Sequence, residues 1–374
     1  MTGPDAPCDV AIVGAGIVGL AHALACARRG LRVVVVDRDA RANGASVRNF
    51  GFVTVSGQAE GAMWGRARRS RDIWLELAEA AGIAIHQRGM LTAARRPEAA
   101  ALVEAFAAGP MGDGCSLLTG REAAARFPQL APGVSAGLLS PHEIRIEPRD
   151  ALPRLAAYLA AAFGVTFLWQ TAVTAAGPGE LLTSRGPIRA RRIVVAPGDD
   201  STTLFPDALA PYGLTRCKLQ MLRVRPDRPV LPHVLMSDLS LIRYGGFADL
   251  PEAAALRSRL EREAGPQLAA GIHLIVAASR DGTCVVGDSH TYDSTPDPFA
   301  DEAIDRMILA EYAELLGEAP AVVERWTGTY ASSAAAPVVV AAPCPEIRVV
   351  TVATGAGMSC AFAVAEDVVE ELDL

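Results

Sequence analysis

Three glycines and one acidic residue near the start of the sequence have the spacing of a dinucleotide-binding site. Gly14, Gly16 and Gly19 fit the pattern G-x-G-x-x-G. Bare glycine backbone lets a pyrophosphate approach closely, and the N-terminus of a following helix attracts its negative charge. Asp37 follows about twenty residues later, where a carboxylate accepts hydrogen bonds from ribose hydroxyls. These residues predict that the chain binds a dinucleotide.

The surrounding sequence contains the elements that must position these residues. An apolar run at 10–13 predicts a strand, and the next apolar stretch predicts a helix that ends near Gly30. A second strand at 33–36 leads into Asp37 and Arg38, which we expect at the ribose end of the site. An ordinary strand–helix–strand turn with chance glycines is the alternative. The strand, helix, second strand and terminal acid together favour the dinucleotide.

A second glycine turn lies at the end of the chain. Gly355 and Gly357 follow an apolar strand, and a helix is predicted from about Ser359, just after Met358. No acid follows at the distance that a second nucleotide site needs. We therefore expect this helix N-terminus to face the negative charge that develops on a reduced flavin, which favours FAD over NAD. A plain C-terminal helix after a glycine turn is the alternative.

Two further segments fit the cofactor site. A buried strand from Ile193 to Ala196 is followed by Gly198, which allows a tight turn. Upstream, residues 171–173 could form a strand that passes the adenine at Val173.

Composition limits the class of protein. A chain of 374 residues accommodates two linked domains, and a net charge of −7 argues against nucleic acid or an anionic membrane as a partner. Seven dispersed cysteines, with no C-x-x-C, suggest free thiols in a reducing compartment. Residues 1–10 lack the features of a signal peptide, and no apolar run is long enough to span a membrane. We expect a cytoplasmic protein.

Several quoted segments resemble one known family over essentially the whole chain. The chain resembles the D-amino-acid-oxidase-like superfamily of FAD-dependent amine oxidoreductases, and within it a branch associated with phosphonate catabolism. Members of that branch are thought to oxidise aminoalkylphosphonates, including N-methylated 2-aminoethylphosphonate. The resemblance implies that Ser46 and Asn49 lie along the flavin diphosphate and ring. The segments that carry it are GASVRNFGFV, CKLQML, EIRIEPRDAL, GDSH and TGAGMS.

The resemblance implies an α/β fold in which a Rossmann-like FAD-binding domain is interleaved with an α+β substrate domain. That substrate domain would be built on a large mixed sheet, as in glycine and sarcosine oxidases. The alternating pattern at 219–224 and the apolar run at 272–279 fit strands of such a sheet. We expect the FAD domain to comprise residues 1–85, 143–205 and 321–374, and the substrate domain to comprise 86–142 and 206–320.

The sequence departs from the family where the substrate anion is usually bound. Many amino-acid-oxidising members have an arginine at the position that Tyr330 occupies here, so another residue must bind the acidic group. Arg48 is one candidate, although it could be a structural arginine, and Arg145 is another. His290 could line the pocket or serve only as a structural hydrogen-bonding residue. Sarcosine oxidases carry a flavin-linked cysteine where this chain has Gly328, so we expect FAD to be bound non-covalently.

Lys218 is the only lysine among 35 lysine and arginine residues. An ammonium is a compact, titratable point charge, whereas a guanidinium is a planar fork that stays protonated. We therefore expect Lys218 to lie in the pocket, where it would contact the phosphonate or hold a water that assists oxygen. A surface lysine without function is the alternative. The alternating segment puts Lys218 and Gln220 on one face of a strand and Cys217 and Leu219 on the other.

The predicted reaction is hydride transfer from the carbon next to a neutral amine to flavin N5. Water would hydrolyse the imine to phosphonoacetaldehyde and an amine, and O₂ would be reduced to hydrogen peroxide. Alternatives are a glycine, sarcosine or D-amino-acid oxidase or dehydrogenase, an NAD(P)H-dependent monooxygenase, and a non-catalytic FAD-binding protein. The six histidines are dispersed and no H-E-x-x-H or G-x-S-x-G is present, so we expect no metal site and no serine nucleophile.

Overall fold

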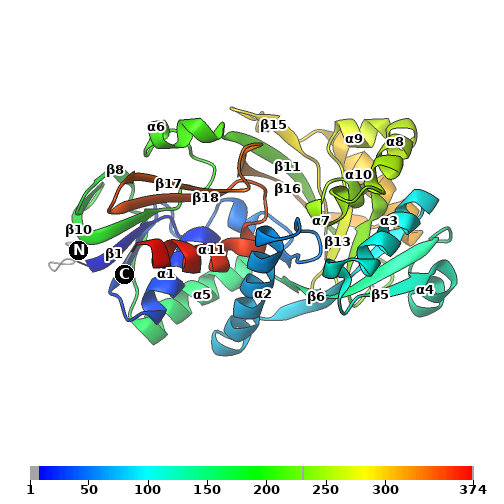
Figure 1. The fold of residues 1–374 in the computed structure, drawn as a ribbon, viewed down its shortest axis with the longest axis horizontal. Helices are drawn as coiled ribbons and strands as arrows, with labels where there is room; N and C mark the ends of the chain where they lie inside the picture. The colour runs from blue at the N-terminus through cyan, green and yellow to red at the C-terminus, as the bar shows by residue number, and fades with distance from the viewer. Residues whose placement is uncertain (1–7, 230, 373–374) are drawn as a thin grey trace.

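The computed structural model describes residues 8–229 and 231–372. The expectation that the chain has no signal peptide rests largely on residues 1–7, which lie outside the described residues. Figure 1 shows two large sheets with their helices, one toward each end of the long axis. Among the helices of the described ranges, none combines the length and apolar character needed to cross a bilayer.

The first sheet has a parallel centre. Its strands run in the order β17-β18-β10-β1-β2-β7, and the pairs β18–β10, β10–β1, β1–β2 and β2–β7 are parallel. Parallel strands bring their carboxyl ends to one edge of a sheet, where ligands bind in open α/β folds. The strands are β1 (Cys8–Val13), β2 (Val33–Val36), β7 (Thr166–Leu168), β8 (Val173–Gly177), β9 (Glu180–Thr183), β10 (Gly186–Val195), β17 (Val338–Cys344) and β18 (Ile347–Val352).

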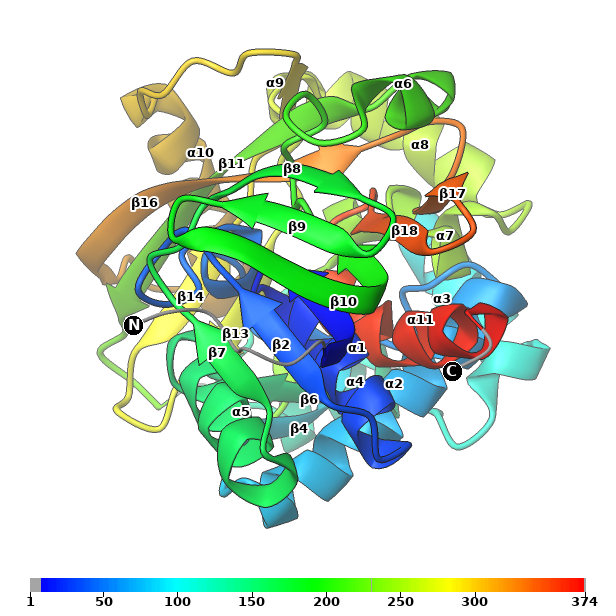
Figure 2. The same cartoon turned by 90° about the vertical axis from the view of Figure 1, so that its left-hand side faces the viewer.

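Helices cover one face of this sheet and a strand layer covers the other. Val10 and Ile12 of β1 pack against α1 (Ile17–Arg28), α5 (Pro148–Phe163) and α11 (Gly357–Glu371). Ala11 points the opposite way and packs near Leu181 and Ile188 of the β8–β10 layer, which Figure 2 shows in green beside β1 and β2. Because both faces are covered, β1 and β2 consist almost entirely of apolar residues.

The predicted elements around the glycines are close to those observed. The strand predicted at 10–13 begins slightly earlier, at Cys8, and the strand at 33–36 is β2. The helix predicted to end near Gly30 ends at Arg28. The C-terminal helix begins at Gly357 rather than Ser359. The strand expected to pass the adenine begins at Val173, and Thr171 precedes it.

The second sheet is mostly antiparallel, and β12–β4 is a parallel pair within it. Its order is β15-β11-β14-β13-β12-β4-β6-β3, with β16 added on β11 and β5 on β6. The α/β class and the large mixed sheet are therefore confirmed. The strands are β3 (Phe52–Val53), β4 (Ile85–Ala94), β5 (Ser116–Thr119), β6 (Ala136–Ile146), β11 (Thr215–Arg225), β12 (Val234–Ser237), β13 (Ile275–Ala278), β14 (Cys284–Gly287), β15 (Thr291–Asp293) and β16 (Ala321–Ser332).

The two faces of the second sheet pack on different helices. Cys217, Leu219 and Met221 of β11 share a core with α3 and α8, whereas Leu222 and Val224 face α10. The remaining helices are α2 (Ala62–Ala80), α3 (Pro97–Ala108), α4 (Gly120–Arg126), α6 (Pro206–Leu209), α7 (Gly245–Ala248), α8 (Ala253–Glu263), α9 (Gly265–Ala269) and α10 (Glu302–Leu316). Short 3₁₀ turns occupy 45–47, 110–112, 210–212 and 238–242.

Strand β16 lies in the second sheet. It pairs antiparallel with β11 along most of its length, with Tyr330 opposite Cys217 and Gly328 opposite Leu219. The predicted domain boundary at residue 321 had placed this strand with the first sheet. The chain leaves the second sheet after β16 and returns to the first at β17.

Trp74 connects helix α2 to α11. Its ring is fully buried, lies 4.9 Å from the ring of Phe362 in an edge-to-face arrangement, and its Nε1–H donates to the carbonyl oxygen of Met358 at 2.9 Å. Aromatic pairs of this geometry add to the stabilisation from apolar burial. Trp74 therefore fixes the first turn of α11, where the second glycine turn of the sequence lies.

We expect Trp74→Ala to lower the free energy of unfolding by about 3–5 kcal/mol, because it leaves a cavity and removes the hydrogen bond to the Met358 carbonyl. Denaturant unfolding with saturating FAD would measure the change. Leu117→Ala, at a side chain that is 42% exposed, is the control and should change the value by less than about 0.5 kcal/mol. A loss below about 1 kcal/mol at Trp74 would contradict this account.

Candidate active site

Two adjoining cavities lie along the carboxyl edge of the first sheet. We name them the Asp37 cavity, of about 340 Å³, and the Tyr330 cavity, of about 510 Å³. Ala45, Ser46 and Gly198 line both of them, so the two cavities adjoin, and we call the pair the hollow. Two adjoining cavities suit an extended ligand with a group bound in each.

The predicted glycines meet the sheet through bare backbone. Gly14 has a φ of +100°, and a Cβ built on it would lie 2.4 Å from the carbonyl oxygen of Ala196. A Cβ on Gly19 would lie 1.8 Å from the oxygen of Gly14. Gly14 and Gly16 line the Asp37 cavity, whereas Gly19 lies behind it and lets α1 pack closely. No larger residue fits at Gly14 or Gly19 without moving the backbone.

Asp37 and Ser46 organise the start of α1. Asp37 accepts hydrogen bonds from the backbone N–H of Ala15 at 2.7 Å and of Asp39 at 2.8 Å. Ser46 Oγ accepts from the N–H of Ile17 at 2.9 Å, at the first residue of α1. Each carboxylate oxygen has a second lone pair, so Asp37 can still accept from a ligand hydroxyl. Arg38 and Val173 line the same cavity, as expected from the sequence.

The other end of the hollow is formed by the second glycine turn. Gly355, Gly357 and Met358 line the Tyr330 cavity at the N-terminus of α11. Gly355 has a φ of +76°, and a Cβ on it would lie 3.1 Å from Cζ of Tyr330. The ring of Tyr330 thus packs against the backbone of Gly355, just before the N-terminus of α11.

Asn49 lies on the wall of the Tyr330 cavity but holds its own loop. Its amide donates to the carbonyl oxygen of Ala45 at 2.7 Å and accepts from the N–H of Gly51 at 2.7 Å. Its side chain therefore shapes the wall that the loop of Ser46 presents to a ligand.

These residues fit FAD. Asp37 lies in the cavity suited to the ribose. The N-terminus of α1 lies beside the same cavity, and the N-terminus of α11 lies beside the Tyr330 cavity. Helix N-termini attract phosphate and developing negative charge. The residues expected from sequence at both ends, apart from the buried Gly19, line the hollow.

Arg48 and Gly328 face each other on the wall of the Tyr330 cavity. A Cβ on Gly328 would lie 3.1 Å from Cβ of Arg48, and the carbonyl of Arg48 accepts from Nε1–H of Trp326 at 3.1 Å. The structure gives the Arg48 guanidinium no hydrogen bond or ion pair within the ranges that it describes. Its backbone is therefore fixed while its charge is available to a ligand.

Arg243 is a site residue that the sequence did not reveal. Its side chain lines the Tyr330 cavity and donates to the hydroxyls of Tyr292 at 2.9 Å and Tyr330 at 3.4 Å. Burial would lower its pKa, but Tyr330, Tyr292 and Asp288 raise the pKa above its ordinary value. Arg243 is thus a permanent cation, and its exposed surface faces the cavity. Nothing distinguished this arginine from the many others in the sequence.

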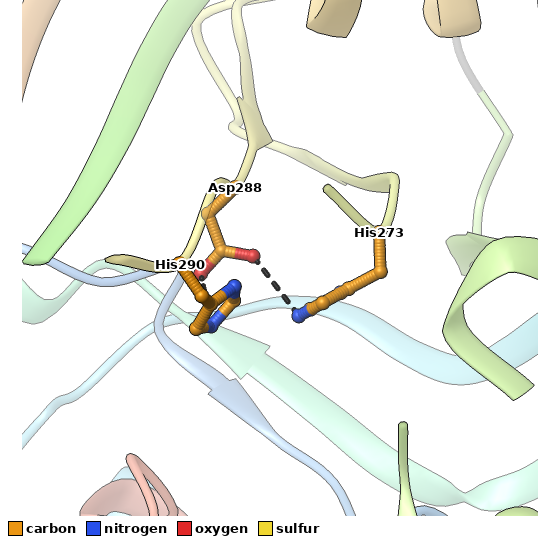
Figure 3. Close-up of side chains that lie close together, drawn as sticks. All are labelled: His273, Asp288 and His290. Carbon is orange, nitrogen blue, oxygen red and sulfur yellow. Dashed lines mark ion pairs between the residues drawn. The ribbon is translucent and has the colours of Figure 1, made fainter. Parts of the chain in front are cut away.

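Three further side chains meet on the same wall: His273, Asp288 and His290 (Figure 3). His273 Nε2 lies 3.2 Å from one carboxylate oxygen of Asp288, and His290 Nε2 lies 3.6 Å from the other. Burial raises the pKa of Asp288 to about 7, although Arg243 opposes this shift. His290 was expected in the pocket and lines it. The other two were missed, although Asp288 stands two residues before His290.

The grouping also bears on the expectation that no metal site exists. That expectation rested on dispersed histidines, yet the fold brings two of them to one carboxylate. The possible ligand atoms of the three residues lie within 4.8 Å of one another. Spacing along the sequence did not reveal this arrangement, because His273 and His290 are separated by strands β13 and β14.

The expectation that Lys218 lies in the pocket is wrong. The predicted alternation is correct, but Leu219 lines the cavity while Lys218 and Gln220 lie on the opposite face of β11. The Lys218 ammonium donates to the carbonyl of Phe299, and Gln220 donates to Asp305 at 2.8 Å. Both therefore hold the segment that leads into α10. Alternation identifies two faces of a strand but not which one meets the cofactor.

Arg145, the weaker candidate for binding the substrate anion, is also excluded from the cavity. Its side chain is fully buried, forms an ion pair with Glu147 at 3.0 Å and donates to the carbonyl of Phe50 at 3.1 Å. Glu147 also pairs with Arg223 at 3.0 Å. Arg145 thus connects β6 to the loop at Phe50 and, through Glu147, to Arg223 of β11.

Comparison with known proteins identifies the family of the chain. Residues 9–371 match the family DAO, described as FAD dependent oxidoreductase. The chain belongs to this family. The prediction that the protein is an FAD-dependent oxidoreductase is therefore confirmed. No curated protein matches the chain.

Solved structures share the whole fold. Glycine oxidase from Bacillus cereus ATCC 14579 superimposes with a TM-score of 0.79 at 19% identity, covering 98% of this chain and 95% of that one. Glycine oxidase from Geobacillus kaustophilus gives 0.78 at 20% identity, with coverage of 98% and 95%. Iminodiacetate oxidase from Chelativorans sp. BNC1 gives 0.71 at 18% identity, with coverage of 96% and 95%. These identities establish the fold.

We expect Asp37→Ala to weaken FAD binding by roughly 10- to 100-fold, the effect of losing a charged hydrogen bond of about 1.5–3 kcal/mol. Titration of the apoprotein with FAD would measure the dissociation constant. Asp9→Ala removes an equal charge at the other end of the first strand, where Asp9 pairs with Arg32, and should leave FAD binding unchanged. Equal dissociation constants for Asp37→Ala and the parent protein would refute the ribose assignment.

Proposed function

We propose that the protein oxidises the C–N bond of a small aminoalkylphosphonate, 2-aminoethylphosphonate or its N-methyl derivative. The products would be phosphonoacetaldehyde and an amine, with O₂ reduced to hydrogen peroxide. The observation that carries the proposal is the pair of cavity arginines, Arg48 and Arg243, in a chain that has Tyr330 where amino-acid-oxidising relatives have arginine.

The two arginines differ in a way that suits a phosphonate. Arg243 is fixed by the hydroxyls of Tyr292 and Tyr330, whereas Arg48 is held only through its backbone. A carboxylate is satisfied by one two-pronged guanidinium pair, but a phosphonate presents three oxygens and up to two negative charges. One fixed and one adjustable guanidinium can bind different oxygens of the same phosphonate.

FAD, when bound, supplies the acceptor for the hydride that leaves the carbon next to nitrogen. The chain would orient the substrate through its anionic group and hold the amine beside the flavin ring. Leu219 and Tyr330 would exclude water on one side, while the N-terminus of α11 would stabilise negative charge on the other. Orientation and desolvation are then the main contributions of the pocket.

Oxidation of a small amino acid is the second candidate. It is favoured by the likeness of the fold to two solved glycine oxidases. A carboxylate would bind Arg243 in place of the missing family arginine. A chain that binds FAD without oxidising any amine would leave the flavin oxidised with every substrate.

We expect N-methyl-2-aminoethylphosphonate or 2-aminoethylphosphonate to reduce the bound flavin faster than glycine, sarcosine, D-alanine or iminodiacetate. Anaerobic stopped-flow spectroscopy would measure the rates. Arg48→Met and Arg243→Met should each weaken phosphonate binding by roughly 10- to 100-fold, corresponding to about 1.5–3 kcal/mol.

Lys218→Met is the matched control for these arginine variants, because it removes a cation from the opposite face of β11. It should leave substrate affinity unchanged. Faster reduction by glycine, sarcosine or D-alanine would replace the phosphonate assignment with the amino-acid one. Absence of reduction by every amine tested would favour the non-catalytic alternative.

We expect acid precipitation to release FAD into the supernatant, because no cysteine lies among the residues that line either cavity. Absorbance of the supernatant and of the washed pellet would measure the distribution. Yellow colour that stays with the precipitated protein after washing would show a covalent bond and disprove non-covalent binding.

A further inference from the structure

Among the described residues that line the Tyr330 cavity, Asp288 carries the only carboxylate. It follows β14 directly and is 5% exposed. The imidazoles of His273 and His290 are stacked, with ring centroids 4.7 Å apart and planes inclined by 25°, and both present Nε2 to its carboxylate (Figure 3). The proposed function assigns no role to these three residues.

No proton donor lies between His290 Nε2 and the carboxylate oxygen of Asp288 that it faces when Asp288 is ionised. His290 Nδ1 lies 2.9 Å from the carbonyl oxygen of Gly271, which can only accept, so Nδ1 carries the proton. Burial and the charge of Arg243 hold the pKa of His290 well below its ordinary value, so the ring is neutral and Nε2 is a bare acceptor. It faces a carboxylate oxygen, which is also an acceptor. A proton or a cation is needed between them.

Two further buried atoms lack a hydrogen bond within the described ranges, Oδ1 of Asp288 and Nδ1 of His273. The contact of Oδ1 with His273 Nε2, at 3.2 Å, is an ion-pair distance without hydrogen-bond geometry. A buried polar group without a partner costs free energy, so native sites supply one. For the carboxylate oxygen that partner is a donor.

A substrate ammonium meets this need better than a metal ion. An ammonium offers two or three N–H donors and no acceptor, which matches the acceptors of Asp288 and His290. A divalent ion would add two positive charges near Arg243, which already acts on both residues. An ammonium adds one charge and loses it when its proton moves.

We propose that Asp288, held between His273 and His290, binds the ammonium of the substrate and accepts its proton. The proposal rests on the amine oxidation argued above. One N–H bond breaks and one O–H bond forms at the carboxylate, and the electron pair stays on nitrogen. The neutral amine can then stabilise the adjacent carbon as hydride leaves. Arg48 and Arg243 would bind the acidic end of the same molecule.

Most ionisable neighbours of Asp288 have pKa values shifted away from 7. Burial raises the pKa of Cys217 to about 11 and raises the pKa of Tyr244. The pKa values of His273 and His290 are lowered, and Arg243 stays charged. Asp288 alone among these has a pKa near 7. Below that pH its carboxyl is protonated and cannot take up the proton of the ammonium, whereas above it the carboxylate can. The ionisable groups around it are Cys217, Arg243, Tyr244, His273, His290, Tyr292 and Tyr330.

The test is anaerobic flavin reduction from pH 5.5 to 10, with the most active amine of the panel. The parent protein should lose rate below about pH 7 and reach a plateau above it. Asp288→Asn should have no plateau near neutrality, because only free amine reacts. Its rate should be about 100-fold lower at pH 8 and approach the parent value near pH 10, where amines of this kind lose their proton.

Two further variants are matched to this one. Asp288→Glu keeps the carboxylate and should keep the fall in rate at low pH, even if Asp288→Asn fails to fold or to hold FAD. Asp227→Asn removes an exposed carboxylate in the same domain and should behave as the parent protein. A parent-like pH profile for Asp288→Asn, or loss of the low-pH fall in Asp288→Glu, would overturn the proposal.

One measurement does not depend on turnover. Infrared spectra of the substrate-free protein should show a carboxylic-acid band that disappears as the pH rises through about 7, and Asp288→Asn should lack this band. Elemental analysis should find no stoichiometric divalent metal, and a metal whose removal by a chelator abolishes flavin reduction would overturn the proposal. If no amine reduces the flavin, the proposed function fails. If amines do so with no change in Asp288→Asn, only the role of Asp288 fails.

Discussion

The structure depends on the absence of side chains where the first helix meets the first sheet. A Cβ added at Gly19 would lie 1.8 Å from the carbonyl oxygen of Gly14, and a Cβ added at Gly14 would lie 2.4 Å from the carbonyl oxygen of Ala196. Strands β1 and β10 and helix α1 can therefore meet through backbone alone. Because the central strands are parallel, Asp37, Gly198 and the start of α11 all reach the same edge. The hollow for FAD follows from this contact.

The second sheet supplies the chemistry that the first sheet lacks. Strand β16 runs beside β11 and ends near the first sheet, where Ser332 bridges to Thr354. It brings Tyr330 against Gly355, and Arg243, which donates to the Tyr330 hydroxyl, lines the same cavity as Asp288. The first sheet therefore contributes the glycine turns and Asp37, and the second sheet with its loops contributes Tyr330, Arg243 and Asp288. The proposed reaction site lies where the two sheets meet.

The sequence predicted best what is local. The glycines, their strands and Asp37 lie within thirty residues of one another, so their spacing constrains their geometry. Lys218 was misplaced because alternation defines two faces of a strand without showing which one faces the cofactor. Asp288 and His273 were missed because strand pairing, not sequence distance, brings them together. Arg243 was missed because arginine is abundant in this chain, so one more carries no signal.

The close approach of Gly328 to Arg48 has a consequence for how such sites can diverge. A side chain added at Gly328, such as the cysteine that sarcosine oxidases use to tether their flavin, would meet the Arg48 side chain at its base. A lineage that acquires the tether must therefore also shift the base of this arginine, whose side chain lines the Tyr330 cavity. Covalent attachment of the cofactor and the position of this cavity cation are thus coupled through one close backbone contact.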